Sequence, residues 1–231
     1  MRYKNHHSKQ LNTSKLFLLC FCTTLSSFYC SAQSENTFTN EVEAITARYD
    51  AIWDTNQETI VFTGSSSVRL WKDLEQRFPN HQIVNSGFGG SESSDLLYFL
   101  NDLVLSYNPK QVFIYEGDND LWAKKRPNQV LDTTEEIIRR IKANNPSTQI
   151  ILIAAKPSIS RWEIRRKYKK LNRKFERLAK KDIQLDYVDV WHPMLNNRKL
   201  MTDIFIEDGL HMNQKGYDIW YEAMKNFVNN P

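Results

Sequence analysis

The chain of 231 residues has only three cysteines, and all of them lie in its first 32 residues: Cys20, Cys22 and Cys30. The rest of the chain cannot form a disulfide bond, so a domain built from it depends on its hydrophobic core for stability. A hydrophobic content of 41% is enough for one well-buried domain at this length and favours one domain over two. We find no internal repeat and no low-complexity tract.

Residues 1–32 lack acidic side chains and have the pattern of a secretory leader. Four basic residues are spread over its first 15 positions. An apolar run follows from Leu16, and the segment ends with the small residues Ser31 and Ala32. The apolar run is about 15 residues long, which is short of the roughly 20 that span a bilayer. The pattern predicts cleavage after Ala32 and export to the periplasm or the exterior. A retained membrane anchor is the alternative.

Without this leader the chain has no excess of either charge. The full sequence has 31 basic and 27 acidic residues, a net charge of +4, and four of the basic residues belong to the leader. The remainder is neutral overall. The charge therefore gives no support for nucleic acid as a partner.

Residues 33–231 have no long hydrophobic run, but five short apolar runs alternate with segments of helical periodicity. The runs are rich in β-branched side chains and begin at Ile60, Gln82, Gln111, Gln149 and Leu185. Such runs are typical of strands buried on both faces of a parallel sheet. The helical segments include a first amphipathic helix over 42–52 and others over 96–104 and 130–141. The pattern predicts a single three-layer α/β/α sandwich with a five-stranded parallel sheet.

Ligands of such sheets bind at the carboxyl ends of the strands, and polar segments follow the first three runs there. After Gly64, the residues Ser65, Ser66 and Ser67 precede a predicted helix. A serine hydroxyl at a helix N-terminus lies where the dipole favours developing negative charge. Taken alone, the three serines favour a simple helix cap.

The second and third runs end in comparable segments. Gly89 and Gly90 follow the second run, and glycines let backbone N–H groups approach a ligand closely, as an oxyanion hole requires. A flexible turn is the alternative. The third run is followed by Asp118, Asn119 and Asp120, which either cap a helix or present a side-chain amide to a reacting oxygen.

Near the C-terminus, Asp208 stands three residues before His211, ahead of a predicted last helix. This spacing lets the carboxylate bind one imidazole nitrogen and leaves the other free to act as a base. A surface turn that only caps the helix is the alternative. His192 follows the fifth run and is the reserve candidate, whereas His81 precedes a strand at the opposite end of the predicted sheet.

Taken in order, these segments resemble the four signature blocks of the SGNH (GDSL-like) hydrolase family, and in particular its platelet-activating-factor acetylhydrolase-like branch. The resemblance covers residues 33–231 and implies the flavodoxin-like fold of that family. It places the nucleophile on Ser66, the base and its carboxylate on His211 and Asp208, and the oxyanion hole on the Ser66 and Gly90 N–H groups with the Asn119 amide.

The sequence departs from the family at one position of the first block. The Asp that usually precedes the nucleophile is Ser65 here, which removes a carboxylate from beside the active serine. Ser65 and Ser67 therefore remain alternative nucleophiles.

The resemblance implies a serine esterase that needs no metal or organic cofactor and hydrolyses a short-chain acyl or acetyl ester of a sugar or lipid-type alcohol. A lysophospholipase or thioesterase for longer acyl chains, and a catalytically silent carbohydrate-binding protein, are the alternatives within the same fold. Metal-dependent phosphoester hydrolysis is a further alternative, for which the candidate ligands are Asp118, Asp120, Asp208 and His211.

Residues 161–181 contain ten basic side chains around an apolar stripe of helical spacing. This pattern predicts an amphipathic helix whose basic face is solvated. The alternative is a weak docking face for anionic lipid head groups or acidic polysaccharide. Trp71, Trp122 and Trp162 are candidates for lining an acyl or sugar site, although tryptophans in helices more often pack in the core.

Overall fold

A computed structural model describes residues 37–229. The strands are β1 (Thr59–Gly64), β2 (Gln82–Gly87), β3 (Gln111–Tyr115), β4 (Gln149–Ile153), β5 (Leu185–Val188), β6 (Leu195–Asn196) and β7 (Lys199–Leu200). The helices are α2 (Thr39–Asp50), α3 (Ser66–Arg69), α4 (Leu74–Arg77), α5 (Ser93–Tyr98), α6 (Leu100–Leu103), η1 (Leu105–Tyr107), α7 (Asp118–Trp122), α8 (Pro127–Asn144), η2 (Trp162–Ile164), α9 (Arg165–Ala179) and α10 (Gln214–Asn229).

The predicted leader and its cleavage site lie outside the described residues. Residues 37–40 form a turn and the start of α2, and the sheet belongs to the compact unit that begins at Glu41. Within residues 37–229, no helix combines the length and the apolarity needed to cross a bilayer.

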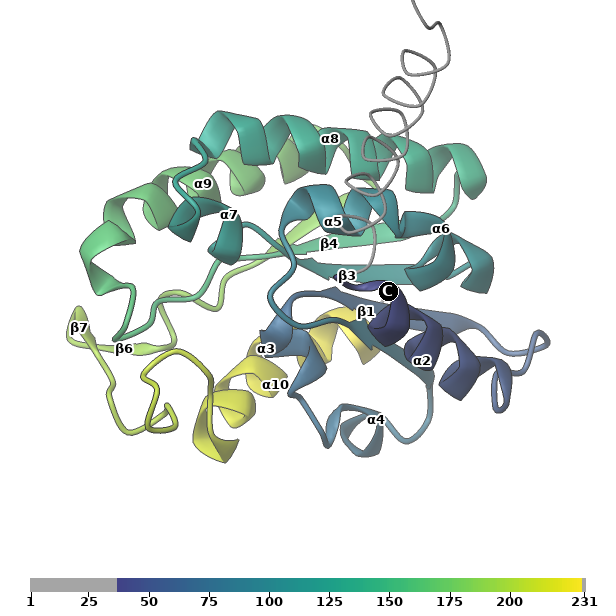
Figure 1. Cartoon of the computed structure of the whole chain (residues 1–231), viewed down its shortest axis with the longest axis horizontal. Helices are drawn as coiled ribbons and strands as arrows, with labels where there is room; N and C mark the ends of the chain where they lie inside the picture. The colour runs from purple at the N-terminus through teal and green to yellow at the C-terminus, as the bar shows by residue number, and fades with distance from the viewer. Residues whose placement is uncertain (1–36, 230–231) are drawn as a thin grey trace, which may run out of the picture. The chain divides into compact units, whose positions relative to one another are not determined.

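Five parallel strands form the main sheet in the order β2-β1-β3-β4-β5. Figure 1 shows α5, α8 and α9 on one face of this sheet and α10 with α3 on the other. Every residue of β1 and β3 is buried, which explains why their sequences are continuous apolar runs without alternation. The predicted three-layer α/β/α sandwich is confirmed.

The strand order determines where a ligand binds. From β1 the chain crosses to β2 on one side and then returns to place β3 on the other side, so the topology switches between β1 and β3. Gly64 at the end of β1 is in register with Gly87 of β2 and with Tyr115 of β3. The segments that follow these three strands therefore start at the same level and surround the switch point.

An aromatic core beneath this edge fixes the central strands against the last helix. Phe62 stacks on Phe113 with ring centroids 4.3 Å apart, and Trp71 packs edge-on against Trp220 of α10 at 5.9 Å. All four rings are almost completely buried, and each contributes about 1.5–3 kcal/mol relative to an exposed side chain. Trp71 is thus a core residue and not part of a ligand site.

Two local predictions differ from the structure, and one element was not predicted. The first helix ends at Asp50, and Ile52 lies beyond it with 65% of its surface exposed. The periodic segment 96–104 is divided between α5 and α6 at Phe99. The hairpin of β6 and β7 was not predicted, and its two-residue turn places Asn197 and Arg198 at positive φ, as type I′ turns require.

The basic segment 161–181 forms η2 and α9, and α9 packs against α8 and β5. Its buried face consists of Tyr168, Leu171, Asn172, Phe175 and Ala179, while most of its basic side chains are exposed or half-buried. The prediction of a solvated basic face holds for the helix but is wrong for Arg161, whose side chain is only 10% exposed. Contact with anionic surfaces stays a prediction.

Candidate active site

The turn from β1 into α3 brings the serine segment to the switch point. Gly64 has φ +125°, and a Cβ atom there would lie 2.0 Å from the carbonyl oxygen of Tyr115, so this position requires glycine. The next amide, that of Ser65, donates to the same carbonyl at 3.1 Å. Helix α3 is only four residues long, so the helix dipole expected from the sequence contributes little here.

The three serines of this turn differ in exposure and contacts. Ser65 and Ser67 are 2% and 3% exposed, whereas Ser66 is half-buried. The Ser66 Oγ atom lies 2.9 Å from Nε2 of His211. Of the three candidates, Ser66 is the one that contacts the predicted base.

Asp208 and His211 are joined side chain to side chain, with Oδ2 of Asp208 2.5 Å from Nδ1 of His211. The second carboxylate oxygen accepts the backbone N–H groups of Leu210 at 2.8 Å and His211 at 2.9 Å. Partial burial acts to raise the pKa of Asp208, but these hydrogen bonds outweigh it and hold the pKa below its ordinary value. The structure thus forms one continuous chain of contacts from Asp208 through His211 to Ser66.

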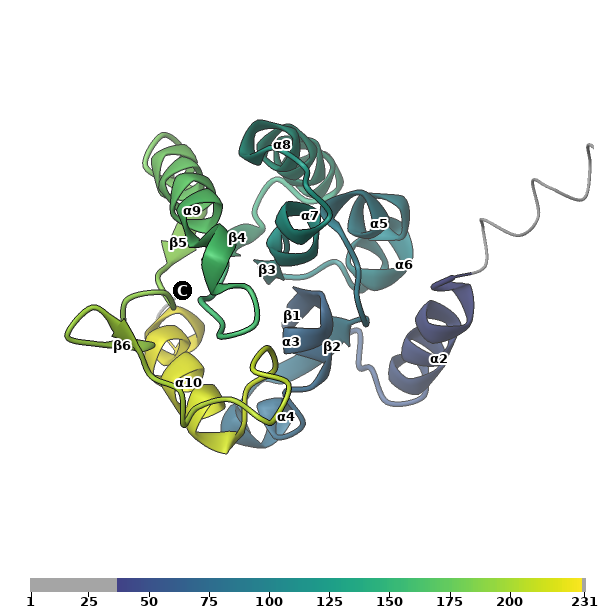
Figure 2. The same cartoon turned by 60° about the vertical axis from the view of Figure 1, so that its left-hand side comes forward.

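The segment after β4 positions the loop that bears Asp208 and His211. The carbonyl of Gly209 accepts the backbone N–H groups of Ile159 at 2.8 Å and Ser160 at 3.1 Å. The carbonyl of Leu210 accepts Nζ of Lys156 at 2.6 Å. Lys156 is fully buried, which lowers the pKa of its ammonium group, although nearby Asp118 acts in the opposite direction. Figure 2 shows the segment before α10 returning towards α3.

The segment after β2 leaves the backbone amide of Gly90 without an acceptor among residues 37–229. Gly90 has φ +79°, and no heavy atom lies within 4 Å of the place where its Cβ would stand. The preceding amide, of Gly89, is already used, since it donates to both carboxylate oxygens of Glu41 at 3.1 Å. Within residues 37–229, the N–H groups of Ser66 and Gly90 have no hydrogen-bond acceptor. Both are therefore free to bind a ligand oxygen.

Asn119 at the start of α7 reaches across to the β2 segment. Its Nδ2 donates to the carbonyl oxygen of Ser91 at 2.8 Å, and its Oδ1 accepts Nη1 of Arg161 at 3.0 Å. The contact with Ser91 places the amide next to the segment that contains Gly90. The second Nδ2 hydrogen has no acceptor among the described residues.

The two acids that flank Asn119 have structural partners. Asp118 accepts Arg161 at 2.6 Å and the hydroxyls of Tyr115, at 3.0 Å, and Tyr168. Asp120 accepts the backbone and side chain of Ser93, at 3.0 and 2.7 Å. In the described part of the chain, no group of three or more His, Cys, Asp or Glu side chains is arranged to hold a metal ion.

The reserve histidine, His192, repeats part of this arrangement. Its Nδ1 lies 2.5 Å from Oδ2 of Asp189, but its side chain is 78% exposed and no serine or threonine contacts its Nε2 in residues 37–229. It stands beyond the edge strand β5, beside a cavity of about 390 Å³ that Lys169 and Trp191 also line. His81 directly precedes β2, at the other end of the sheet.

Two other cavities differ in their relation to Ser66. A groove of about 350 Å³ lies between the hairpin β6–β7 and the segment after β4, and it is lined by Ile159, Trp162, Arg198, Lys199, Leu200 and Thr202. Ile159 donates to Gly209, so this groove borders the loop of Asp208 and His211. Trp162 therefore remains a candidate ligand-binding residue.

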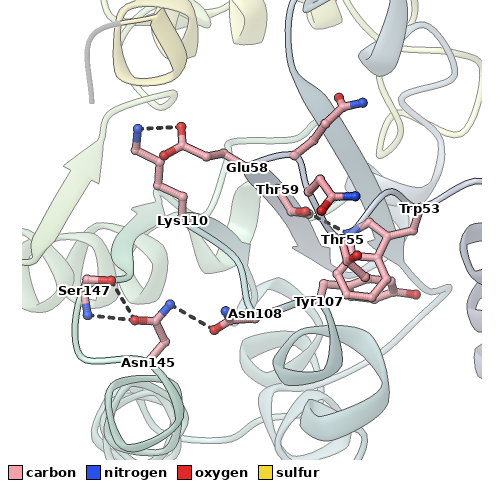
Figure 3. Close-up of a pocket in the computed structure, with 11 residues that line it drawn as sticks. Trp53, Thr55, Glu58, Thr59, Tyr107, Asn108, Lys110, Asn145 and Ser147 are labelled. Atoms are coloured by element: carbon pink, nitrogen blue, oxygen red, sulfur yellow. Dashed lines mark hydrogen bonds and ion pairs between the residues drawn. The ribbon is translucent and has the colours of Figure 1, made fainter.

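A larger cavity of about 420 Å³ lies at the amino ends of the strands (Figure 3). Trp53 and Tyr107 form one wall, and the polar side chains pair with one another, as Lys110 does with Glu58 at 2.8 Å. Its position beside the starts of β1 and β3 separates it from Ser66 by the length of the sheet. Size alone does not make it the reactive site.

Sequence reasoning missed Lys156, Arg161 and Glu41 as parts of this region. In the sequence Arg161 is indistinguishable from the basic residues that follow it, and Lys156 and Glu41 belong to no recognisable motif. Their contacts depend on which strand ends are neighbours in the sheet. No local pattern in the sequence identifies these neighbours.

The family model for GDSL-like lipases and acylhydrolases matches residues 45–219. No curated protein matches the chain. Among solved structures, a protein from Streptococcus pneumoniae described as a platelet activating factor superposes with a TM-score of 0.72 at 24% identity, over 87% of this chain and 98% of that one. A GDSL-like lipase from Bacteroides thetaiotaomicron superposes with a TM-score of 0.69 at 22% identity, over 81% of this chain and 97% of that one. A variant of an acetyl-xylooligosaccharide esterase from Geobacillus superposes with a TM-score of 0.62 at 19% identity, over 75% of this chain and 95% of that one. At these identities the superpositions establish a shared fold.

Proposed function

The chain belongs to the GDSL-like lipase/acylhydrolase family and is a carboxylic ester hydrolase, and we propose that it uses Ser66, His211 and Asp208 as its catalytic triad. The observation that carries this proposal is the continuous chain of contacts from Asp208 Oδ2 to His211 Nδ1, at 2.5 Å, and from His211 Nε2 to Ser66 Oγ, at 2.9 Å. Contacts of this order are those of a nucleophile, its base and the group that orients the base.

In the first half of the reaction, His211 Nε2 takes the proton of Ser66 as Oγ bonds to the ester carbonyl carbon. Asp208 keeps the other ring nitrogen protonated and stabilises the imidazolium that forms. The tetrahedral intermediate collapses when the bond to the alcohol oxygen breaks, and His211 donates its proton to that oxygen. The acyl group remains on Ser66. In the second half, His211 takes a proton from a water molecule as the water oxygen bonds to the acyl carbon. The bond from that carbon to Ser66 Oγ then breaks, His211 returns the proton to Oγ, and the carboxylic acid is released.

The negative charge on the carbonyl oxygen is stabilised by the backbone N–H groups of Ser66 and Gly90 and by the Asn119 amide. Support comes from the two backbone amides, which have no acceptor within residues 37–229, and from the second Nδ2 hydrogen of Asn119. Loss of one donor of this kind typically costs about 2.7–4 kcal/mol of transition-state stabilisation.

We propose a short acyl group, such as acetyl, on a sugar or glycerol-type alcohol as the substrate. The groove beside Ile159 and Trp162 would take the alcohol part, since a tryptophan face and polar neighbours suit a sugar ring. The acetyl-xylooligosaccharide esterase is a relative in fold with a substrate of this kind. We also propose that the protein is exported, on the strength of the leader pattern in residues 1–32.

The decisive test combines labelling and turnover. We expect a fluorophosphonate ester to inactivate the wild-type protein and to add its mass to the peptide that contains Ser66, whereas Ser66→Ala remains unlabelled. Hydrolysis of p-nitrophenyl acetate should survive EDTA. Labelling of Ser65 or Ser67 would assign the role of nucleophile to that serine in place of Ser66. Loss of activity on chelation would support the metal-dependent alternative.

A further inference from the structure

We propose that Arg161 is a positioning residue that fixes the Asn119 amide in the orientation needed for oxyanion stabilisation. This inference rests on the proposed function. Its basis is the contact between Nη1 of Arg161 and Oδ1 of Asn119, at 3.0 Å, in a side chain that is only 10% exposed.

The chemistry of the two groups determines which way the amide points. A guanidinium group can only donate hydrogen bonds, so the Asn119 atom that faces Arg161 must be the carbonyl oxygen. The NH₂ group is therefore on the other side, where one hydrogen binds the Ser91 carbonyl at 2.8 Å. The second hydrogen is left available next to the Gly90 segment. Donation by a cation also polarises the amide, which makes its remaining N–H a better donor.

Arg161 is itself held in place by the residue before Asn119. Asp118 accepts the same Nη1 atom at 2.6 Å and is held in turn by the Tyr115 and Tyr168 hydroxyls. Burial acts to raise the pKa of Asp118, but Lys156 and then Arg161 outweigh it and keep the carboxyl group ionised. The guanidinium also lies 5.4 Å over the ring of Trp122. One largely buried cation thus connects the segment after β4 with both Asp118 and Asn119.

The arrangement predicts that the loss of Arg161 reduces turnover and not substrate binding. The amide would keep its contact with Ser91 but lose the donor that fixes its oxygen. Because oxyanion stabilisation acts in the transition state, kcat should fall while KM changes little.

The test is a double-mutant cycle of Arg161→Met and Asn119→Ala on p-nitrophenyl acetate. If Arg161 acts through Asn119, Arg161→Met should lower kcat about 10- to 100-fold in the wild-type background but less than about 3-fold in Asn119→Ala. Arg161→Lys, which keeps a donor and the charge, should recover part of the loss. Arg140→Met on the exposed face of α8 is the matched control and should leave kcat unchanged.

The outcomes distinguish a failure of the oxyanion role of Asn119 from a failure of the positioning role of Arg161. If Asn119→Ala keeps full activity, the oxyanion assignment fails and with it the role of Arg161. If Asn119→Ala loses activity and Arg161→Met costs the same factor in both backgrounds, Arg161 acts elsewhere and this inference is overturned. Unfolding temperatures of all variants are measured alongside. If Arg161→Met does not fold, the same cycle is run with Arg161→Lys, and equal losses in both backgrounds would again overturn the inference.

Discussion

The Nε2 atom of His211 lies 2.9 Å from the Oγ atom of Ser66, although 145 residues separate the two positions. Helix α10 makes this contact possible because it packs beside α3 on the same face of the sheet. The Tyr217 hydroxyl on α10 donates to the Ser67 carbonyl at 3.0 Å, and its ring stacks on Trp71 at 5.6 Å. The alignment of nucleophile and base therefore depends on core packing beneath them.

Ser66→Ala should lower kcat for p-nitrophenyl acetate by about 10⁴-fold or more, since the nucleophilic oxygen is removed. The free energy of unfolding should change by less than about 1 kcal/mol, because only a half-buried hydroxyl is lost. Chemical denaturation and steady-state kinetics measure the two effects. Ser65→Ala and Ser67→Ala are the matched controls, and a loss of activity in either, with Ser66→Ala still active, would move the nucleophile.

Activity should fall on acidification because the imidazole that accepts the Ser66 proton must be neutral. The pKa of Asp208 is held below its ordinary value, so its carboxylate remains ionised throughout the weakly acidic range.

Asp208→Asn should reduce kcat by about 10⁴-fold, since an amide favours the wrong imidazole tautomer. The pH–rate profiles of the wild type and of Asp208→Asn measure both the loss of activity at low pH and the lower kcat of the variant. His192→Ala should keep the wild-type profile, and its inactivity would transfer the role of base to His192.

Glu116→Gln should stabilise the protein progressively as the pH rises. Burial, and next the Asp120 carboxylate, raise the pKa of Glu116 well above its ordinary value. A carboxyl group with a raised folded-state pKa stabilises the fold fully below its unfolded pKa, and this contribution is lost as the pH rises towards the folded pKa.

Thermal unfolding at a series of pH values from 4 to 8 measures the difference between the Gln variant and the wild type. The difference should grow from about pH 4.5 upwards, the window given by the direction of this shift. Glu135→Gln on the exposed face of α8 is the control and should show no such trend. A difference that is the same at every pH would mean that Glu116 does not titrate differently in the folded state.

Trp162→Ala should raise KM for an acetylated oligosaccharide and leave p-nitrophenyl acetate hydrolysis nearly unchanged. The ring lines the groove beside Ile159 and is stacked on Trp191 at 6.1 Å, so its position is fixed before a ligand binds. Parallel kinetics on the two substrates separate the binding of the alcohol part from the chemistry. Equal losses on both would show that Trp162 only supports the local structure.

Short acyl esters should be hydrolysed more efficiently than long ones. The segments after β1, β2 and β3 are short and offer no lid for an acyl tunnel. In such a shallow site each added methylene gains far less than the roughly 0.8 kcal/mol of full burial, so kcat/KM should not increase along the series. The p-nitrophenyl esters from acetyl to decanoyl measure this directly. A steady increase with chain length would reveal a buried acyl channel and would make lysophospholipid the leading substrate.

Much of the fold was predictable because its causes are local in the sequence. Five β-branched runs separated by helical periodicity predict a buried parallel sheet, since strands covered on both faces need no polar alternation. The resemblance to the signature blocks of the SGNH family also selected Ser66, Gly90, Asn119, Asp208 and His211 as site candidates. The hairpin of β6 and β7, with four paired residues, gave too short a signal to predict.

The sequence by itself determined the sheet, the order of the polar segments and the short-range pair of Asp208 and His211, because each depends on residues near one another in the chain. Only the tertiary structure decided that Ser66, and neither neighbouring serine, contacts His211. It also decided that Arg161 turns inward to Asn119 and Asp118, while most of the basic residues after it stay on the surface. These contacts arise where different strand ends meet, and the strand order that brings those ends together is fixed by packing across the whole sheet.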